Sequence, residues 1–249
     1  MRKLYEKSEL TFALACIVVY CILQSLANPL NKIIGIEYSA SAVMCIIQAA
    51  VILKFVQSSG LLEQYGLCKT TIPARQFLYY IPLLVLSTRN LWHGAAVNFP
   101  LAGTVCYIIC MLCVGFVEEV LFRGFLFKAI ARDNIKTAII ISSVTFGLGH
   151  LLNLVNGSGM ELAANLFQVV GAAAIGFLFV ILFYRGGSLI PCIITHSAIN
   201  AISAFANETG LTMERRMVSN LIWLAIIVIY TIILTKTLPK IEKKCLCKN

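Results

Sequence analysis

The sequence predicts an all-α protein, a bundle of about eight helices that spans a membrane. Two observations carry this prediction. Of the 249 residues, 59% are hydrophobic and only 12% are charged, whereas soluble domains average roughly 45–50% apolar and about 25% charged residues. The apolar residues also fall in long blocks, each close to the roughly 20 residues that cross a bilayer core. We therefore treat residues 1–249 as a single integral membrane domain.

Eight apolar segments are expected to span the membrane. The first ends at a turn-forming cluster, residues 28–32, which contains Pro29. The predicted spans are residues 9–27, 37–56, 76–95, 100–128, 137–154, 161–184, 187–206 and 217–238.

The placement of positive charge supports this count independently. Most of the 20 Lys and Arg residues, including those of a basic C-terminal tail, fall on one side of the predicted membrane, while Lys32, Arg89, Arg215 and Arg216 fall on the other. The positive-inside rule then predicts a multi-pass cell membrane protein with cytoplasmic N- and C-termini. The net charge of +9 fits this topology and contact with anionic lipid, and we expect no nucleic-acid partner. The short connections are typical of a bacterial or archaeal protein.

Two adjacent glutamates lie inside the fourth span, where ionisable residues are functional candidates by default. Glu119 and Arg123 are four residues apart and share a helix face, so they can pair. Glu118 points about 100° away and has no partner on its own helix, which makes it a candidate general base. A purely structural interpretation, in which both glutamates pair with Arg123 and lock helices together, stays open.

Two further spans carry polar residues at comparable depth. His150 ends the fifth span after Gly147 and Gly149, two glycines that would let another backbone or a substrate approach closely. His196 and Asn200, in the seventh span, are four residues apart and project from one face. Each alone could be an interhelical hydrogen-bonding residue. Counted along the helices from the inner loops, Glu118, His150 and His196 lie on the order of 15–25 Å deep, which predicts one converging site.

Three motifs in this order carry a family resemblance. Residues 118–123 read Glu-Glu-x-x-x-Arg, Phe146 precedes His150 as Phe-x-x-x-His, and residues 196–200 read His-x-x-x-Asn. They resemble the CAAX-protease and bacteriocin-processing (CPBP) family, which includes prenyl-protein CAAX endopeptidases of the Rce1 type. The motifs cover about a third of the chain, and the corresponding catalytic core is expected at about residues 100–206.

The resemblance implies an intramembrane endopeptidase whose eight helices enclose a catalytic cavity. It implies that Glu118 and His150 activate a water molecule, and that His196 and Asn200 stabilise the oxyanion. Glu119 and Arg123 would then be structural or orienting. The implied partner is a membrane-associated or lipid-modified peptide or protein, whose identity the sequence does not give. The oligomeric state is equally open.

We expect no cofactor, although zinc is the alternative. Two histidines and a carboxylate can hold zinc with water in the fourth position, in which case Glu118, His150 and His196 would be the ligands. An HExxH motif is absent, and Asn200 beside His196 suits hydrogen bonding better than zinc ligation.

Two function classes compete with a protease. The first is a non-proteolytic membrane scaffold or bacteriocin self-immunity protein with the same fold. The second is a proton-coupled transporter, because intramembrane Glu and His residues also form proton relays. The halves of the chain show no internal repeat and no paired broken helices, which argues against a transporter.

Overall fold

The computed structural model describes residues 1–155 and 162–239. In this part of the chain the structure is helical, apart from loops and one isolated β-bridge between Ala95 and Ala206. The elements are α1 (Arg2–Lys7), α2 (Glu9–Ile34), α3 (Ser39–Ser58), η1 (Ala74–Tyr80), α4 (Ile81–Ser87), η2 (Arg89–Leu91), α5 (Leu101–Glu119), η3 (Val120–Leu126), α6 (Phe127–Ala131), α7 (Ile135–Gly149), α8 (Leu152–Val155), α9 (Leu162–Gly186), α10 (Ile190–Ile202), η4 (Ser203–Phe205) and α11 (Met213–Thr237).

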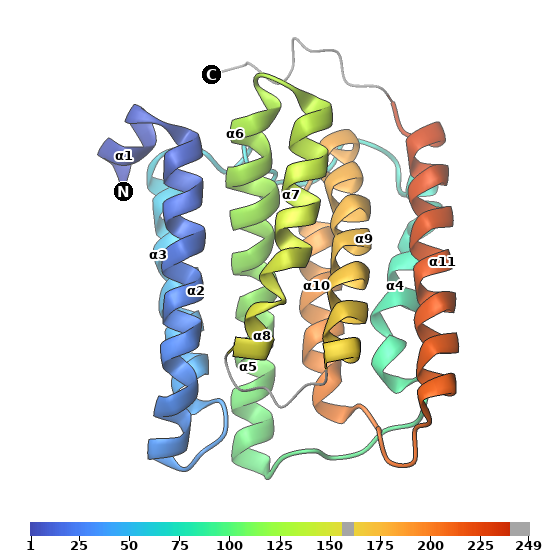
Figure 1. The fold of residues 1–249 in the computed structure, drawn as a ribbon. Helices are drawn as coiled ribbons and strands as arrows, with labels where there is room; N and C mark the ends of the chain where they lie inside the picture. The colour runs from blue at the N-terminus through green and yellow to red at the C-terminus, as the bar shows by residue number, and fades with distance from the viewer. Residues whose placement is uncertain (156–161, 240–249) are drawn as a thin grey trace.

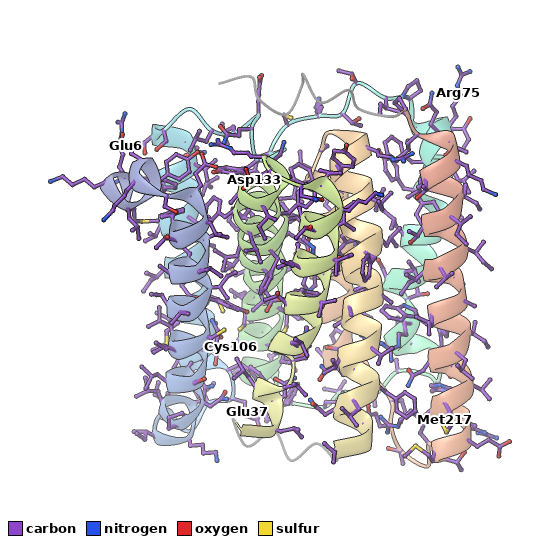
Figure 2. The ribbon with its side chains drawn as sticks, turned by 45° about the horizontal axis from the view of Figure 1, so that its top comes forward. Glu6, Glu37, Arg75, Cys106, Asp133 and Met217 are labelled. Carbon is purple, nitrogen blue, oxygen red and sulfur yellow. The ribbon has the colours of Figure 1, made fainter. Side chains whose placement is uncertain are left out.

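The long helices stand side by side, and α1 lies at the same end of the bundle as the C-terminal end of α11 (Figure 1). Glu6, Arg75 and Asp133 lie toward that end, whereas Glu37 and Met217 lie toward the opposite one (Figure 2). The first helix and the C-terminal end of the last helix thus lie at one end of the bundle. The basic tail used in the charge argument, residues 240–249, lies outside the described residues.

Six helices in the described part of the chain are long and apolar enough to cross a membrane. Large apolar side chains stay exposed on them, for example Val18 at 56% and Ile22 at 53%. Exposed apolar surface of this extent is typical of helices that face lipid. The six are consistent with an integral membrane protein; they are Glu9–Ile34, Ser39–Ser58, Leu101–Ala131, Ile135–Leu154, Ala164–Gly186 and Met213–Thr237.

The expected spans 76–95 and 187–206 are not among these six helices. The first is broken into η1, α4 and η2, and the last three residues of η1, Leu78, Tyr79 and Tyr80, have positive φ values of 50–59°. Pro82 stands in the first turn of α4, a position that proline favours because it has no amide hydrogen to donate. The second span gives the shorter apolar helix Ile190–Phe205.

The predicted turn at residues 28–32 is wrong, because α2 continues through Pro29 to Ile34 and ends at Gly35 with φ 77°. Asn31, expected in the turn, instead binds the start of α3. Its Oδ1 accepts hydrogen bonds from the amides of Ala40 (2.8 Å) and Ser41 (3.2 Å). These amides belong to the first turn of a helix and need an external acceptor, so a polar residue of α2 caps α3.

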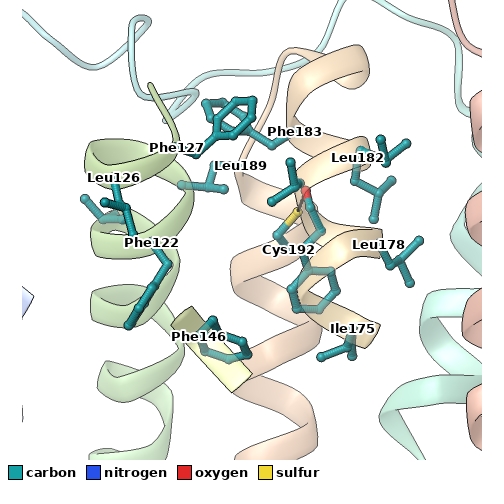
Figure 3. Close-up of a cluster of buried hydrophobic side chains, with 14 of the residues drawn as sticks. Phe122, Leu126, Phe127, Phe146, Ile175, Leu178, Leu182, Phe183, Leu189 and Cys192 are labelled. Atoms are coloured by element: carbon teal, nitrogen blue, oxygen red, sulfur yellow. Dashed lines mark hydrogen bonds between the residues drawn. The ribbon is translucent and has the colours of Figure 1, made fainter. Parts of the chain in front are cut away.

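The main apolar core extends from α2, α3 and α11, for example Phe12, Phe55 and Tyr230, to a part that lies between η3, α6, α9 and α10. Figure 3 shows its buried side chains, with Phe146 of α7 at the lower edge of the cluster. Phe122 and Phe146 meet edge to face, with ring centroids 5.3 Å apart. This core packs against η3, α7 and α10, which carry or adjoin the polar residues predicted to form the site.

Candidate active site

Glu119 and Arg123 form a fully buried ion pair. The two side chains pair as their spacing predicts, with Arg123 Nη1 3.0 Å from Glu119 Oε1 and both side chains 0% exposed. The guanidinium lies over the ring of Phe146 at 4.0 Å and over that of Phe179 at 5.6 Å. Gly176 makes room for it, since a Cβ there would lie 3.2 Å from Arg123 Nη2. Arg123 is therefore enclosed between aromatic rings and one carboxylate.

The helix changes its pitch directly after the two glutamates. Residues 120–126 form the π-helical turn η3, a rare element that is frequent at functional sites. Ser142 of α7 donates a hydrogen bond of 2.8 Å to the carbonyl of Phe122 inside this turn. The same carbonyl also accepts a hydrogen bond from the Phe127 amide, so Ser142 is its second donor and ties α7 to this turn.

His196 of α10 joins the ion pair from the other side. Its Nδ1 lies 2.8 Å from Glu119 Oε1. An ionised carboxylate held by an arginine only accepts hydrogen bonds, so Nδ1 is the donor. The other ring nitrogen, Nε2, lies 3.6 Å from Glu118 Oε2. One imidazole therefore stands between the two adjacent glutamates.

The contact depends on a close approach of α5 and α10. A Cβ at Gly115 would lie only 2.3 Å from Ser197 Oγ and 2.6 Å from Ser197 N. Ser197 Oγ also donates a hydrogen bond of 3.0 Å to the carbonyl of Leu112. Because Ser197 follows His196, this contact sets how deeply the histidine reaches toward the glutamates.

Glu118 has a partner that the sequence did not reveal. As expected, it lacks a partner on its own helix among the described residues, but Tyr20 of α2 donates a hydrogen bond to Glu118 Oε1 at 2.6 Å. The Glu118 side chain is 15% exposed, whereas that of Glu119 is fully buried. The one available signal was a phenolic hydroxyl within an apolar span, which alone is too common to single out.

His150 lies beside this cluster without bonding to it directly. Its Nδ1 is 3.1 Å from the carbonyl of Phe146, and the Phe146 ring contacts both histidines, with centroids 5.2 Å from His150 and 5.6 Å from His196. Asn165 of α9, which the sequence reasoning missed, donates a hydrogen bond of 2.9 Å to the His150 carbonyl.

The two glycines before His150 behave differently. Gly147 permits a close approach, as expected, because a Cβ there would lie 2.8 Å from Ala173 Cβ and 2.9 Å from the Val169 carbonyl. At Gly149 a Cβ would meet no atom of the described residues within 4 Å, so no neighbouring backbone of this part of the chain lies close to it, and the expected approach of a substrate there stays a prediction. α7 ends at Gly149, so this glycine stands at a helix terminus and makes no close helix contact.

Asn200 lies one turn beyond His196 on α10, and among the described residues its side chain has no hydrogen-bond partner. The structure thus brings Glu118, Glu119, Arg123 and His196 together and places His150 alongside them. Within the same part of the chain, Glu119 Oε2 and Arg123 Nε and Nη2 are buried without a partner. Such groups are costly, and they are typical of sites where strain or binding serves a function.

The zinc alternative, with Glu118, His150 and His196 as ligands, stays a prediction. Glu119 Oε1 is shared by Arg123 and His196 Nδ1, and His150 Nδ1 faces a backbone carbonyl. Among the described residues, no three His, Cys, Asp or Glu side chains are grouped so that they could hold a metal. We therefore derive no step through zinc.

Comparison with known proteins adds one match. Residues 100–202 match the family model described as type II CAAX prenyl endopeptidase Rce1-like. No curated protein and no solved structure matches the chain significantly. The matched segment contains the two glutamates and Arg123 of α5 and η3, His150, and the His196 and Asn200 pair of α10. Residues 100–202 are therefore a domain of the Rce1-like type II CAAX prenyl endopeptidase family, a family of peptidases.

Proposed function

We propose that the protein is an intramembrane endopeptidase that hydrolyses a peptide bond in a membrane-associated or lipid-modified substrate. One observation carries the proposal. Glu118 Oε2 lies 3.6 Å from His196 Nε2, and the other nitrogen of that imidazole is bound to the buried Glu119–Arg123 pair. A carboxylate and an oriented imidazole thus face one another inside a peptidase-family segment.

Glu118 acts as the general base in this proposal, and His150 helps to hold the water that Glu118 deprotonates. The water oxygen bonds to the carbonyl carbon of the scissile peptide. The peptide C–N bond then breaks, and the proton taken up by Glu118 passes to the leaving nitrogen. His196 Nε2 and the Asn200 amide stabilise the negative charge that develops on the carbonyl oxygen.

The bonding of His196 suits this second role. Since Nδ1 donates to Glu119, an Nε2–H is available only when the ring is an imidazolium. The proposal therefore requires the imidazolium form of His196 when the oxyanion develops, beside Arg123 as the second cation of the cluster. Buried charges need such compensation. Glu119 and Arg123 are therefore orienting residues that fix the face His196 presents to the substrate.

The reaction proposed here needs no metal ion. In this mechanism Glu118 activates the water and hydrogen-bond donors stabilise the oxyanion, so neither step requires a Lewis acid. Dialysis of the purified protein against a chelator should leave the cleavage rate unchanged. A rate that falls and returns with added zinc would replace the Glu118 mechanism by a metal-dependent one.

The family name points to prenylated substrates, and a substrate with a lipid anchor would reach a site between membrane helices from within the bilayer. The helices that carry the site also expose apolar surface. We propose a membrane-associated or lipid-modified peptide as the substrate class, with an internally quenched peptide carrying a farnesylated cysteine three residues before its C-terminus as the first probe.

The test compares peptide termini in the membranes of cells that express the wild type or Glu118→Gln. The exposed residue Glu63, changed to Gln, is the matched control, because it loses the same charge away from the site. New termini with the wild type and the control, but not with Glu118→Gln, are expected. Identical termini in all three would exclude proteolysis. A retained phenotype or partner binding in Glu118→Gln would then favour a scaffold or immunity protein, and lost proton-dependent flux would favour a transporter.

A further inference from the structure

Among the described residues, Tyr20 is the one outside the matched segment that bonds to Glu118. It lies on α2, 98 residues away in the chain, and α2 packs against η3, the π-helical turn that follows the two glutamates. Its hydroxyl is 2.6 Å from Glu118 Oε1. This distance is in the range of a charge-assisted O–H···O⁻ hydrogen bond, roughly 2.5–2.7 Å.

The chemistry of the pair assigns the hydrogen. A tyrosine hydroxyl has one hydrogen to donate, and an ionised carboxylate only accepts. That hydrogen is therefore committed to Oε1, which leaves Oε2 as the oxygen that faces His196 Nε2 at 3.6 Å. The two contacts lie on opposite oxygens of one carboxylate, so together they fix its orientation.

We propose that Tyr20 is a positioning residue for the general base: it holds Glu118 Oε1 so that Oε2 is directed at the reacting water. This inference rests on the proposed function of Glu118. Tyr20 does not touch the substrate in this proposal and acts only through the carboxylate.

The alternative is that Tyr20 simply attaches α2 to the rest of the bundle. Another residue already provides such an attachment, since Gln24, one turn further along α2, donates a hydrogen bond of 3.0 Å to Gln48 Oε1 of α3. A second buried tyrosine serves as a control, because its hydroxyl only joins two segments of the bundle. Tyr230 of α11 is fully buried and donates a hydrogen bond of 2.8 Å to the Phe77 carbonyl, and neither of these residues belongs to the proposed site.

The experiment measures kcat and KM for the farnesylated quenched peptide in proteoliposomes, together with the thermal unfolding midpoint. Tyr20→Phe removes only the hydroxyl. We expect its kcat to fall roughly tenfold to a hundredfold, the effect of one hydrogen bond to a charged group, with KM unchanged. Tyr230→Phe should lower the unfolding midpoint and leave kcat unchanged.

A second arm shows whether Tyr20 acts through Glu118. Adding Tyr20→Phe to Glu118→Gln should cause no further loss of rate, because the residue that Tyr20 positions has already lost its function. A further loss in the double variant would overturn the inference, as would a Tyr20→Phe enzyme with wild-type kcat. If the wild type and Glu118→Gln do not differ, the proposed function fails, and the role of Tyr20 fails with it.

Discussion

Two adjacent glutamates have different environments, and this difference decides what each can do. Glu119 is fully buried, and its carboxylate is paired with Arg123 and His196. Glu118 is partly exposed and bonded to a neutral hydroxyl. Among the described residues Glu118 has no arginine partner, and its oxygens meet the Tyr20 hydroxyl and, at 3.6 Å, His196 Nε2; it can therefore accept a proton more readily than a carboxylate held in a buried arginine pair.

Removing Arg123 should destabilise the protein strongly. Arg123→Met keeps the apolar contacts with Phe146 and Phe179 but leaves Glu119 as a buried charge without its arginine. We expect a loss of about 3–5 kcal/mol in the free energy of unfolding, measured by thermal or denaturant unfolding in detergent. Arg132→Met is the control, since its ion pair with Glu9 is half exposed on the Arg132 side and is worth less than about 1 kcal/mol. Equal losses in both variants would contradict this assignment.

The sequence alone predicted one part of the site and missed another for a physical reason. The Glu119–Arg123 pair follows from helical periodicity, which links residues four apart. The bonds of Glu118 with Tyr20 and of Glu119 with His196 join residues 98 and 77 positions apart, and the periodicity of one helix carries no information on its neighbours. The family motifs indicated that His196 would be near, but no motif includes Tyr20.

At the scale of the helices, the site depends on a glycine where α5 meets α10. Gly115→Ala should force the two helices apart, because its Cβ would overlap the backbone of Ser197 at 2.6 Å. We expect a loss of roughly 1–3 kcal/mol from overpacking and a lower cleavage rate, as His196 moves away from Glu118. Gly149→Ala, whose Cβ would meet no atom of the described residues within 4 Å, should keep the unfolding midpoint of the wild type. Similar midpoints for the two variants would show that α5 and α10 are not in close contact.

Hydropathy located the apolar segments correctly, but it did not predict which of them form continuous long helices. The six long helices correspond to six of the expected spans, since a long apolar block that must satisfy its backbone groups in lipid becomes a helix. The segment 76–95 was also expected to span, but it contains Pro82, and its backbone turns at three consecutive positive φ values. Conversely, Pro29 did not end α2. Asn31, two residues later and still within α2, accepts a hydrogen bond from the first turn of α3 and so caps that second helix.

For the whole molecule, the structure and the charge distribution can be combined into a topology. The α1 end of the bundle also holds the C-terminal end of α11 (Figure 1), and it is the end that the charge count of the sequence assigns to the cytoplasm. We propose that this end is cytoplasmic. The opposite end then bears Arg89, Arg215 and Arg216, where Arg216 is paired with Glu208.

Reporter fusions in bacteria test this orientation. A green fluorescent protein fused to the C-terminus should fluoresce, since it folds in the cytoplasm. Alkaline phosphatase fused after Asn98, in the exposed loop before α5, should be active because it requires the other side. Phosphatase activity of a C-terminal fusion would invert the topology and contradict the charge-based orientation.

The central proposal is that Glu118 generates the nucleophile for peptide hydrolysis. Its most direct test is the cleavage rate of the farnesylated quenched peptide by purified wild type and Glu118→Gln at equal amounts of folded protein. We expect Glu118→Gln to lower kcat by roughly a hundredfold to ten-thousandfold while its unfolding midpoint stays close to that of the wild type. Cleavage by Glu118→Gln at the wild-type rate would contradict the proposal.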